Sequence, residues 1–166
     1  MIRIPDYNFT PMNNEILAVM DGWVYGEFFP DFDMSAYHRS AGRGEDPPAG
    51  PAGCDGFGVF DENGELVGLF EYYFDDAGTA SIGLALRPDL TNQGRGPEFL
   101  EAGIRFLVSN YGFGGDHVYL DVDRRNEPAL KLYERTGFVT LPEQSTDEEI
   151  RMRRAVGWSG DSVTAD

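Results

Sequence analysis

The chain has little positive charge and almost no cysteine. It contains 13 Lys and Arg residues, Lys131 being the only lysine, against 29 Asp and Glu, so its formal net charge is −16 over 166 residues. Because nucleic-acid phosphates are bound through a surplus of Lys and Arg, this balance argues against a nucleic-acid partner. Cys54 is the only cysteine, which excludes an internal disulfide and a cysteine-based zinc cluster, and no metal is predicted.

Long apolar runs and a signal-like N-terminus are also missing. We therefore expect a cytoplasmic protein with no membrane partner. The length fits a single domain, placed at residues 1–156, with a Gly- and Pro-rich mobile loop at 40–56 and a flexible tail at 157–166. The acidic residues either attract a cationic partner or solvate the surface in a salty cytoplasm, and their even spread favours the second explanation.

The most informative segment is residues 84–99, which reads L-A-L-R-P-D-L-T-N-Q-G-R-G-P-E-F. An apolar strand ends there in a loop that starts a helix. Gly94 and Gly96 allow a ligand to approach the backbone closely, and Pro97 suits the first helical turn. Such a loop presents backbone N–H groups at a helix N-terminus, which is a ready site for phosphate.

The residues that follow predict a strand–helix–strand unit. The helix carries Leu100, Ile104, Leu107 and Val108 on one face, and residues 117–123 then alternate apolar and polar side chains as a strand does. This order predicts a right-handed parallel crossover.

Two other phosphate-binding motifs fit less well. A P-loop needs Lys and then Ser or Thr after its last glycine, whereas Pro97 and Glu98 follow Gly96. A dinucleotide fold needs a third glycine where Phe99 stands, and the strands expected upstream do not fit its opening.

A second motif lies at residues 126–138, which read N-E-P-A-L-K-L-Y-E-R-T-G-F. Asn126 is a good N-cap, Gly137 is a candidate left-handed C-cap, and the residues between them favour a helix. Asn126 and Tyr133 are seven residues apart, so they share a helix face about 10 Å apart along the axis.

Together the two segments resemble the GNAT N-acetyltransferase superfamily. The later helix of that family reads Asn-x-x-Ala-x-x-x-Tyr-Glu-x-x-Gly-Phe, which matches at every specified position (Asn126, Ala129, Tyr133, Glu134, Gly137 and Phe138). Its cofactor loop reads Gln/Arg-x-x-Gly-x-Gly/Ala, which matches at Gly94 and Gly96, with Thr91 in place of Gln or Arg. The resemblance covers residues 56–152.

A shifted register of the loop motif would begin at Gln93 but would place Glu98 in the last position. The first register keeps both glycines and is preferred. The resemblance then implies a cofactor, acetyl-CoA, whose pyrophosphate rests on the loop residues Thr91, Asn92, Gln93, Gly94, Arg95 and Gly96. It also implies that the strand containing Leu84 and Leu86 binds the pantetheine arm and splays from its parallel neighbour.

The implied reaction is direct transfer of an acetyl group to an amine. A backbone N–H near Leu86 would bind the oxyanion. Asn126 and Tyr133 would lie at the cofactor, and Tyr133 would protonate the departing CoA thiolate, because a phenol is neutral at pH 7 and can donate. The general base is less certain, with Glu71 first and Asp121 or Asp123 as alternatives. His38 and His117 are also candidates.

Upstream of the loop, residues 57–60, 66–74 and 80–86 are expected to form antiparallel strands, and residues 149–156 a final strand. Helices are expected after Asn13 or Asn14 and after Asp33. Five aromatic residues lie between these helices and form either core or an acceptor wall (Trp23, Tyr25, Phe28, Phe29 and Phe32). The predicted fold class is α/β with a mixed sheet, antiparallel strands first, then the parallel βαβ crossover with splayed central strands and flanking helices.

Three functions are consistent with these features. The first is an N-acetyltransferase that acts on a small-molecule or peptide amine. The second is a non-catalytic acyl-CoA sensor, because Thr91 departs from the motif and the base is uncertain. The third modifies the N-terminus or a lysine of a partner protein. A homodimer is possible in each case.

Overall fold

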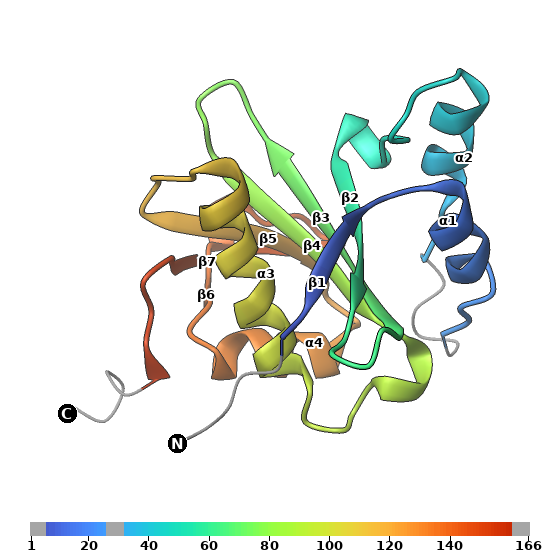
Figure 1. Ribbon diagram of the computed structural model, residues 1–166. Coiled ribbons are helices and arrows are strands. Elements are labelled where there is room, and N and C mark those ends of the chain that lie inside the picture. The colour runs from blue at the N-terminus through green and yellow to red at the C-terminus, as the bar shows by residue number, and fades with distance from the viewer. Residues whose placement is uncertain (1–5, 26–31, 161–166) are drawn as a thin grey trace.

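The computed structural model describes residues 6–25 and 32–160 and forms a seven-stranded mixed sheet flanked by helices (Figure 1). The strand order is β1-β2-β3-β4-β5-β7-β6. The strands are β1 (Asn8–Pro11), β2 (Asp55–Phe60), β3 (Leu66–Phe74), β4 (Ala80–Leu86), β5 (His117–Asp123), β6 (Val139–Thr140) and β7 (Glu149–Ala155). The helices are α1 (Asn14–Met20), α2 (Ser35–Gly42), α3 (Gly96–Tyr111) and α4 (Glu127–Arg135).

The first four strands are antiparallel, which the sequence predicts for β2, β3 and β4, whereas β1 was not predicted. The turn between β2 and β3 contains Asn63 and Gly64, and Gly64 has a φ of 79°, a value that glycine adopts without strain. The side chain of Asp61 accepts backbone hydrogen bonds from Asn63 and Glu65 and closes the turn. The predicted antiparallel strands at 57–60 and 66–74 are therefore confirmed.

β4 and β5 are the two strands joined by the parallel crossover, and they pair over only two positions. Ala80 lies opposite Val118 and Ser81 opposite Tyr119, and no further pair follows along the seven residues of either strand. β5 continues on its other side in full antiparallel register with β7. The predicted splay of the central strands is confirmed, and it opens toward the C-terminal ends of β4 and β5.

The sheet separates two hydrophobic cores. On one face, α3 and α4 pack on the larger core, in which Phe70, Ile82 and Leu120 meet Leu100 and Ile104 of α3. On the other face, α1 and α2 cover Leu69 of β3 and leave β4, β5 and β7 without a helix of their own. The site described below lies at the uncovered part of this second face and in the splay.

The helix ends follow local hydrogen bonding. The Asn13 side chain accepts from the Ile16 N–H at 2.8 Å and caps α1, which confirms that predicted start. The Asp33 side chain accepts from the Ser35 N–H at 2.9 Å just ahead of α2. α3 ends at Tyr111 and is capped by Gly112, whose φ of 61° is left-handed.

Three segments differ from the sequence-based boundaries. The expected loop at 40–56 starts inside α2 and ends inside β2, because Ser40 is buried and accepts a hydrogen bond from the Ala49 N–H. The expected tail begins at Gly157, yet the Trp158 ring stacks on the Arg154 guanidinium. The short strand β6 was not predicted. Phe28, Phe29 and residues 161–166 lie outside the described residues.

Candidate functional site

The cofactor loop joins β4 to α3 and is fixed by its own side chains. Thr91 Oγ1 donates to the Pro88 carbonyl at 2.9 Å, and Gln93 Nε2 donates to the Asp89 carbonyl at 2.6 Å. Asn92 and Gly94 have φ values of 61° and 76°, so both residues adopt a left-handed backbone conformation. Thr91 therefore has a structural function in the loop that the family motif does not indicate.

The amides of this loop are available to a ligand. Within the described part of the chain, the backbone N–H groups of residues 92–96 donate no hydrogen bond to protein. They precede the N-terminus of α3, whose dipole favours a negative charge at that point. A Cβ on Gly96 would lie 3.0 Å from the Leu132 side chain, so the loop packs directly on α4.

The splay exposes one edge of β4. The Arg87 N–H donates to the Val67 carbonyl at 2.8 Å, so Arg87 and alternate residues before it direct their backbone groups toward β3. Leu84 and Leu86 consequently direct theirs into the gap toward β5. One of these groups is engaged, because the Tyr25 hydroxyl donates to the Leu86 carbonyl.

The helix α4 follows β5 along the chain and packs against the cofactor loop through Leu132. Asn126 Oδ1 accepts from the Ala129 N–H at 3.1 Å and caps the helix as predicted. The Tyr133 ring is buried to 8% exposure and packs edge-on against Phe138. Its hydroxyl makes no hydrogen bond to another described residue, and burial raises the Tyr133 pKa well above its ordinary value. A neutral, unengaged donor is thus available there.

The structure places two of the candidates for the general base, Asp121 and Asp123, in different surroundings. Asp121 is 44% exposed and pairs with Arg151 at 2.8 Å on the open face. Asp123 is bonded by Arg125, which lowers the Asp123 pKa to about 2 and makes it a poor proton acceptor. His38 pairs with Asp21 at the surface.

Glu71 on β3 differs from both. Its carboxylate accepts hydrogen bonds from the Tyr37 hydroxyl at 2.5 Å and the Tyr73 hydroxyl at 3.1 Å. Burial raises the Glu71 pKa, while these hydrogen bonds act in the opposite direction. A carboxylate with a raised pKa is better matched to accept a proton near neutral pH.

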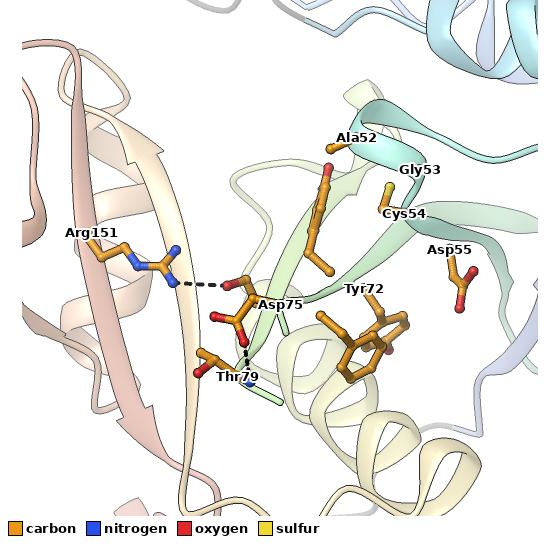
Figure 2. Close-up of a pocket in the computed structure, with 11 residues that line it drawn as sticks. Ala52, Gly53, Cys54, Asp55, Tyr72, Asp75, Thr79 and Arg151 are labelled. Atoms are coloured by element: carbon orange, nitrogen blue, oxygen red, sulfur yellow. Dashed lines mark hydrogen bonds between the residues drawn. The ribbon is translucent and has the colours of Figure 1, made fainter. Parts of the chain in front are cut away.

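A pocket of about 370 Å³ lies next to this group, at the C-terminal end of β3 and the N-terminal end of β4. It is lined by Cys54, Tyr73, Asp75, Ser81 and Arg151, among others. Arg151 reaches toward the pocket from β7 (Figure 2). Its guanidinium donates a hydrogen bond to Ser81 Oγ at 3.2 Å. The Arg151 guanidinium also stacks over the Tyr119 ring at 5.0 Å.

The family comparison agrees with this geometry. A sequence model described as the Acetyltransferase (GNAT) family matches residues 20–138, well over half of the chain. The chain belongs to the GNAT acetyltransferase family. No protein among the curated sequences matches it.

Solved GNAT structures share the fold at low identity. One is Campylobacter jejuni N-acetyltransferase PseH in complex with acetyl coenzyme A, with 15% identity, a TM-score of 0.66 and coverage of 90% of this chain and 99% of that one. Another is Vibrio cholerae spermidine N-acetyltransferase in complex with CoA and spermine, with 17% identity, a TM-score of 0.64 and coverage of 90% and 95%. A dodecameric structure of the Vibrio cholerae enzyme has 16% identity, a TM-score of 0.60 and coverage of 90% and 94%.

Two features are absent from the described residues. Residues 6–25 and 32–160 hold no cluster of three or more His, Cys, Asp and Glu that is arranged to bind a metal ion. No helix in the same part of the chain combines the length and apolarity needed to cross a membrane.

Sequence reasoning found the loop and α4 but missed three tyrosines at the site. Tyr25 was assigned only to an aromatic cluster, where its ring does pack against Phe32. Tyr37 falls in the helix expected after Asp33 and Tyr73 in the strand expected at 66–74, and the sequence pattern predicts a contact with Glu71 for neither residue. Local spacing carries no signal for Tyr37, because its partner is 34 residues away.

Proposed function

We propose that this GNAT protein is an acetyl-CoA-dependent N-acetyltransferase that transfers the acetyl group directly to a primary amine. The observation that carries the proposal is the separation of β4 from β5 after two residue pairs, directly before a loop with five unengaged amides. The pantetheine arm would lie along the exposed edge at Leu84 and Leu86. The pyrophosphate would then lie against residues 91–96, with Arg95 adding a positive charge.

The residues of the site supply each group that the reaction needs. Coenzyme A supplies the thioester and leaves as a thiolate. A β4 backbone N–H near Leu86 binds the developing oxyanion, and the Tyr133 hydroxyl donates its proton to the departing sulfur. Glu71 accepts the proton of the acceptor ammonium, whereas Asp121 is occupied by Arg151 and ranks second.

The proposed acceptor is a small-molecule or peptide amine. The spermidine N-acetyltransferase relative was solved with spermine, a cationic amine, and a chain with a net charge of −16 attracts cations. An N-terminus or lysine of a partner protein is the alternative acceptor. We further propose that the protein is cytoplasmic. We also propose that it can form a homodimer, and light scattering would test this oligomeric state.

Two measurements test the proposal. Isothermal titration calorimetry with acetyl-CoA and with CoA should show saturable binding near a 1:1 ratio. Release of free thiol from acetyl-CoA should then depend on an added amine from a panel of diamines, amino acids and peptides. Absence of heat with both coenzymes would refute the cofactor site, and binding without thiol release with any amine would favour the acyl-CoA sensor.

A further inference from the structure

The Glu71 carboxylate is held by hydroxyl groups from two different parts of the chain. Tyr37 of α2 donates to Oε2 at 2.5 Å, and Tyr73 of β3 donates to Oε1 at 3.1 Å. The Cys54 thiol, just before β2, also faces this carboxylate and favours its ionised form. Both oxygens of one acid are thus oriented by neutral donors, an arrangement that keeps a carboxylate ready to accept a proton.

Tyr37 fits its place because two residues there have no side chain. Its ring is fully buried at 0% exposure. A Cβ on Gly50 would lie 2.6 Å from the Tyr37 ring, and a Cβ on Gly56 only 2.1 Å from the Tyr37 hydroxyl. The segments before and within β2 therefore leave a slot for the phenol, and α2 places the hydroxyl against Glu71.

Tyr73 lies between Glu71 and the pocket. Its side chain lines the pocket, whereas Glu71 is not among the lining residues. Opposite Glu71 on β4 stands Gly83, where a Cβ would lie 3.1 Å from Glu71 Oε1 and 3.7 Å from the Tyr73 ring. Both side chains therefore lean over Gly83, next to the exposed backbone of Leu84.

We propose that Tyr73 is a catalytic proton relay between an acceptor amine in this pocket and Glu71, and that Tyr37 is a positioning residue for Glu71. The inference rests on the proposed acetyltransferase function. The ammonium N–H bond breaks and its proton passes to Tyr73 Oη, while the proton of Tyr73 passes to Glu71 Oε1. The products are a neutral amine, which attacks the thioester, a neutral Tyr73 and a protonated Glu71, so charge and protons balance.

The experiment compares three Tyr→Phe variants in kcat/KM as a function of pH. Tyr73→Phe should lower kcat/KM for the amine by about 100-fold, a typical contribution of proton transfer, and leave acetyl-CoA binding unchanged. Tyr37→Phe removes a hydrogen bond to the ionised carboxylate, so the acid limb of the profile should move to higher pH. Tyr7→Phe is the matched control, because the buried Tyr7 hydroxyl has no hydrogen-bond partner among the described residues and Tyr7 does not line the pocket, so its profile should not move.

A second measurement follows Glu71 without turnover. In protein labelled with ¹³C at the glutamate carboxyl, the Glu71 resonance is assigned by its loss in Glu71→Gln, and its titration is compared between variants. The midpoint should rise in Tyr37→Phe and in Tyr73→Phe and stay constant in Tyr7→Phe. Full activity of Tyr73→Phe, or titration midpoints that do not change in the first two variants, would overturn the inference. Absence of acetyl-CoA binding in calorimetry would instead refute the proposed function.

Discussion

Tyr133 is the residue for which sequence and structure agree most closely. The motif places it on α4, and the structure gives it a buried ring and a hydroxyl that no described residue engages. We expect Tyr133→Phe to lower kcat by about 100-fold, because the thiolate loses its proton donor. Calorimetry should show unchanged acetyl-CoA affinity. Unchanged turnover in the thiol-release assay would remove Tyr133 from the acid role.

The ionised Glu71 carboxylate should destabilise the folded protein, because the carboxylate is buried. Burial raises its pKa in the folded state, so at a pH above the unfolded-state value of about 4.3 the folded protein is destabilised by ionising this carboxyl. Glu71→Gln should therefore raise the thermal midpoint at pH 8 by roughly 2 °C or more and abolish turnover.

The pH dependence of this difference in thermal midpoint provides a control. Below about pH 4 the carboxyl is protonated in both states, so the midpoints of Glu71→Gln and the wild type should converge. Calorimetric scans at several pH values measure the difference. A gap that grows as the pH falls would contradict the assigned environment of Glu71.

At the residue scale, sequence predicts only groups that belong to a local motif. Asn126 and Gly94 were found because a helix cap and a left-handed turn impose their own residue types. Tyr25 and Tyr37 were not, because each reaches its partner through the tertiary fold, over 61 and 34 residues of chain. The hydrogen bond of Thr91 within the cofactor loop could not be predicted either, since it depends on the turn at Pro88.

Among the elements, the loop between β4 and α3 offers the sharpest test of the cofactor site. Gly94 has a φ of 76°, and a Cβ there would meet no atom within 4 Å, so only backbone conformation opposes a side chain. Gly94→Val should distort the amide array and weaken acetyl-CoA binding at least about tenfold in calorimetry, because a β-branched residue is strained at this φ. Gly114→Val, also in open space but with no positive φ, is the control and should bind normally.

The junction of α3, β7 and the end of α4 depends on a buried arginine. Arg154 is 1% exposed, pairs with Glu101 of α3 and donates to the Thr136 carbonyl at 3.1 Å. Glu101→Leu should lower the free energy of unfolding by about 3 kcal/mol, because the Arg154 charge remains buried without its partner. Urea unfolding measures this loss.

Two further variants make that test specific. Adding Arg154→Met to Glu101→Leu should recover much of the stability, because no uncompensated charge remains. Arg43→Met, which breaks an exposed pair with Glu45, should change stability little. A double variant as unstable as Glu101→Leu alone would show that the salt bridge is not the cause.

Element order was largely predictable, whereas some element ends were not. The sequence predicted β2, β3 and β4 at 57–60, 66–74 and 80–86, and the loop motif predicted the start of α3. β6 has only two residues and forms because β7 offers it an edge, so it leaves no pattern in the sequence. The Trp158 ring likewise contacts the Arg154 guanidinium, and the local composition does not predict this contact.

At the scale of the whole molecule, the net charge of −16 opposes an anionic coenzyme. Local amides and the α3 dipole must bind the pyrophosphate against this field, and added salt screens long-range repulsion more than short contacts. Association of acetyl-CoA should therefore accelerate when NaCl rises from about 0.03 M to about 0.3 M. Stopped-flow measurements with a fluorescent CoA analogue test this, and slower association in salt would contradict it.

Because β4 and β5 pair at only two positions, the facing edges of these two strands are largely unpaired, in addition to the two outer edges of the sheet. Unpaired strand margins invite pairing with other extended chains, and here two of them face each other inside the molecule. A narrow ligand that carries amide groups would fill the gap between β4 and β5 and hydrogen-bond to the unpaired edges, as an additional strand would. The empty protein should accordingly be more prone to self-association on mild heating than the protein saturated with its coenzyme.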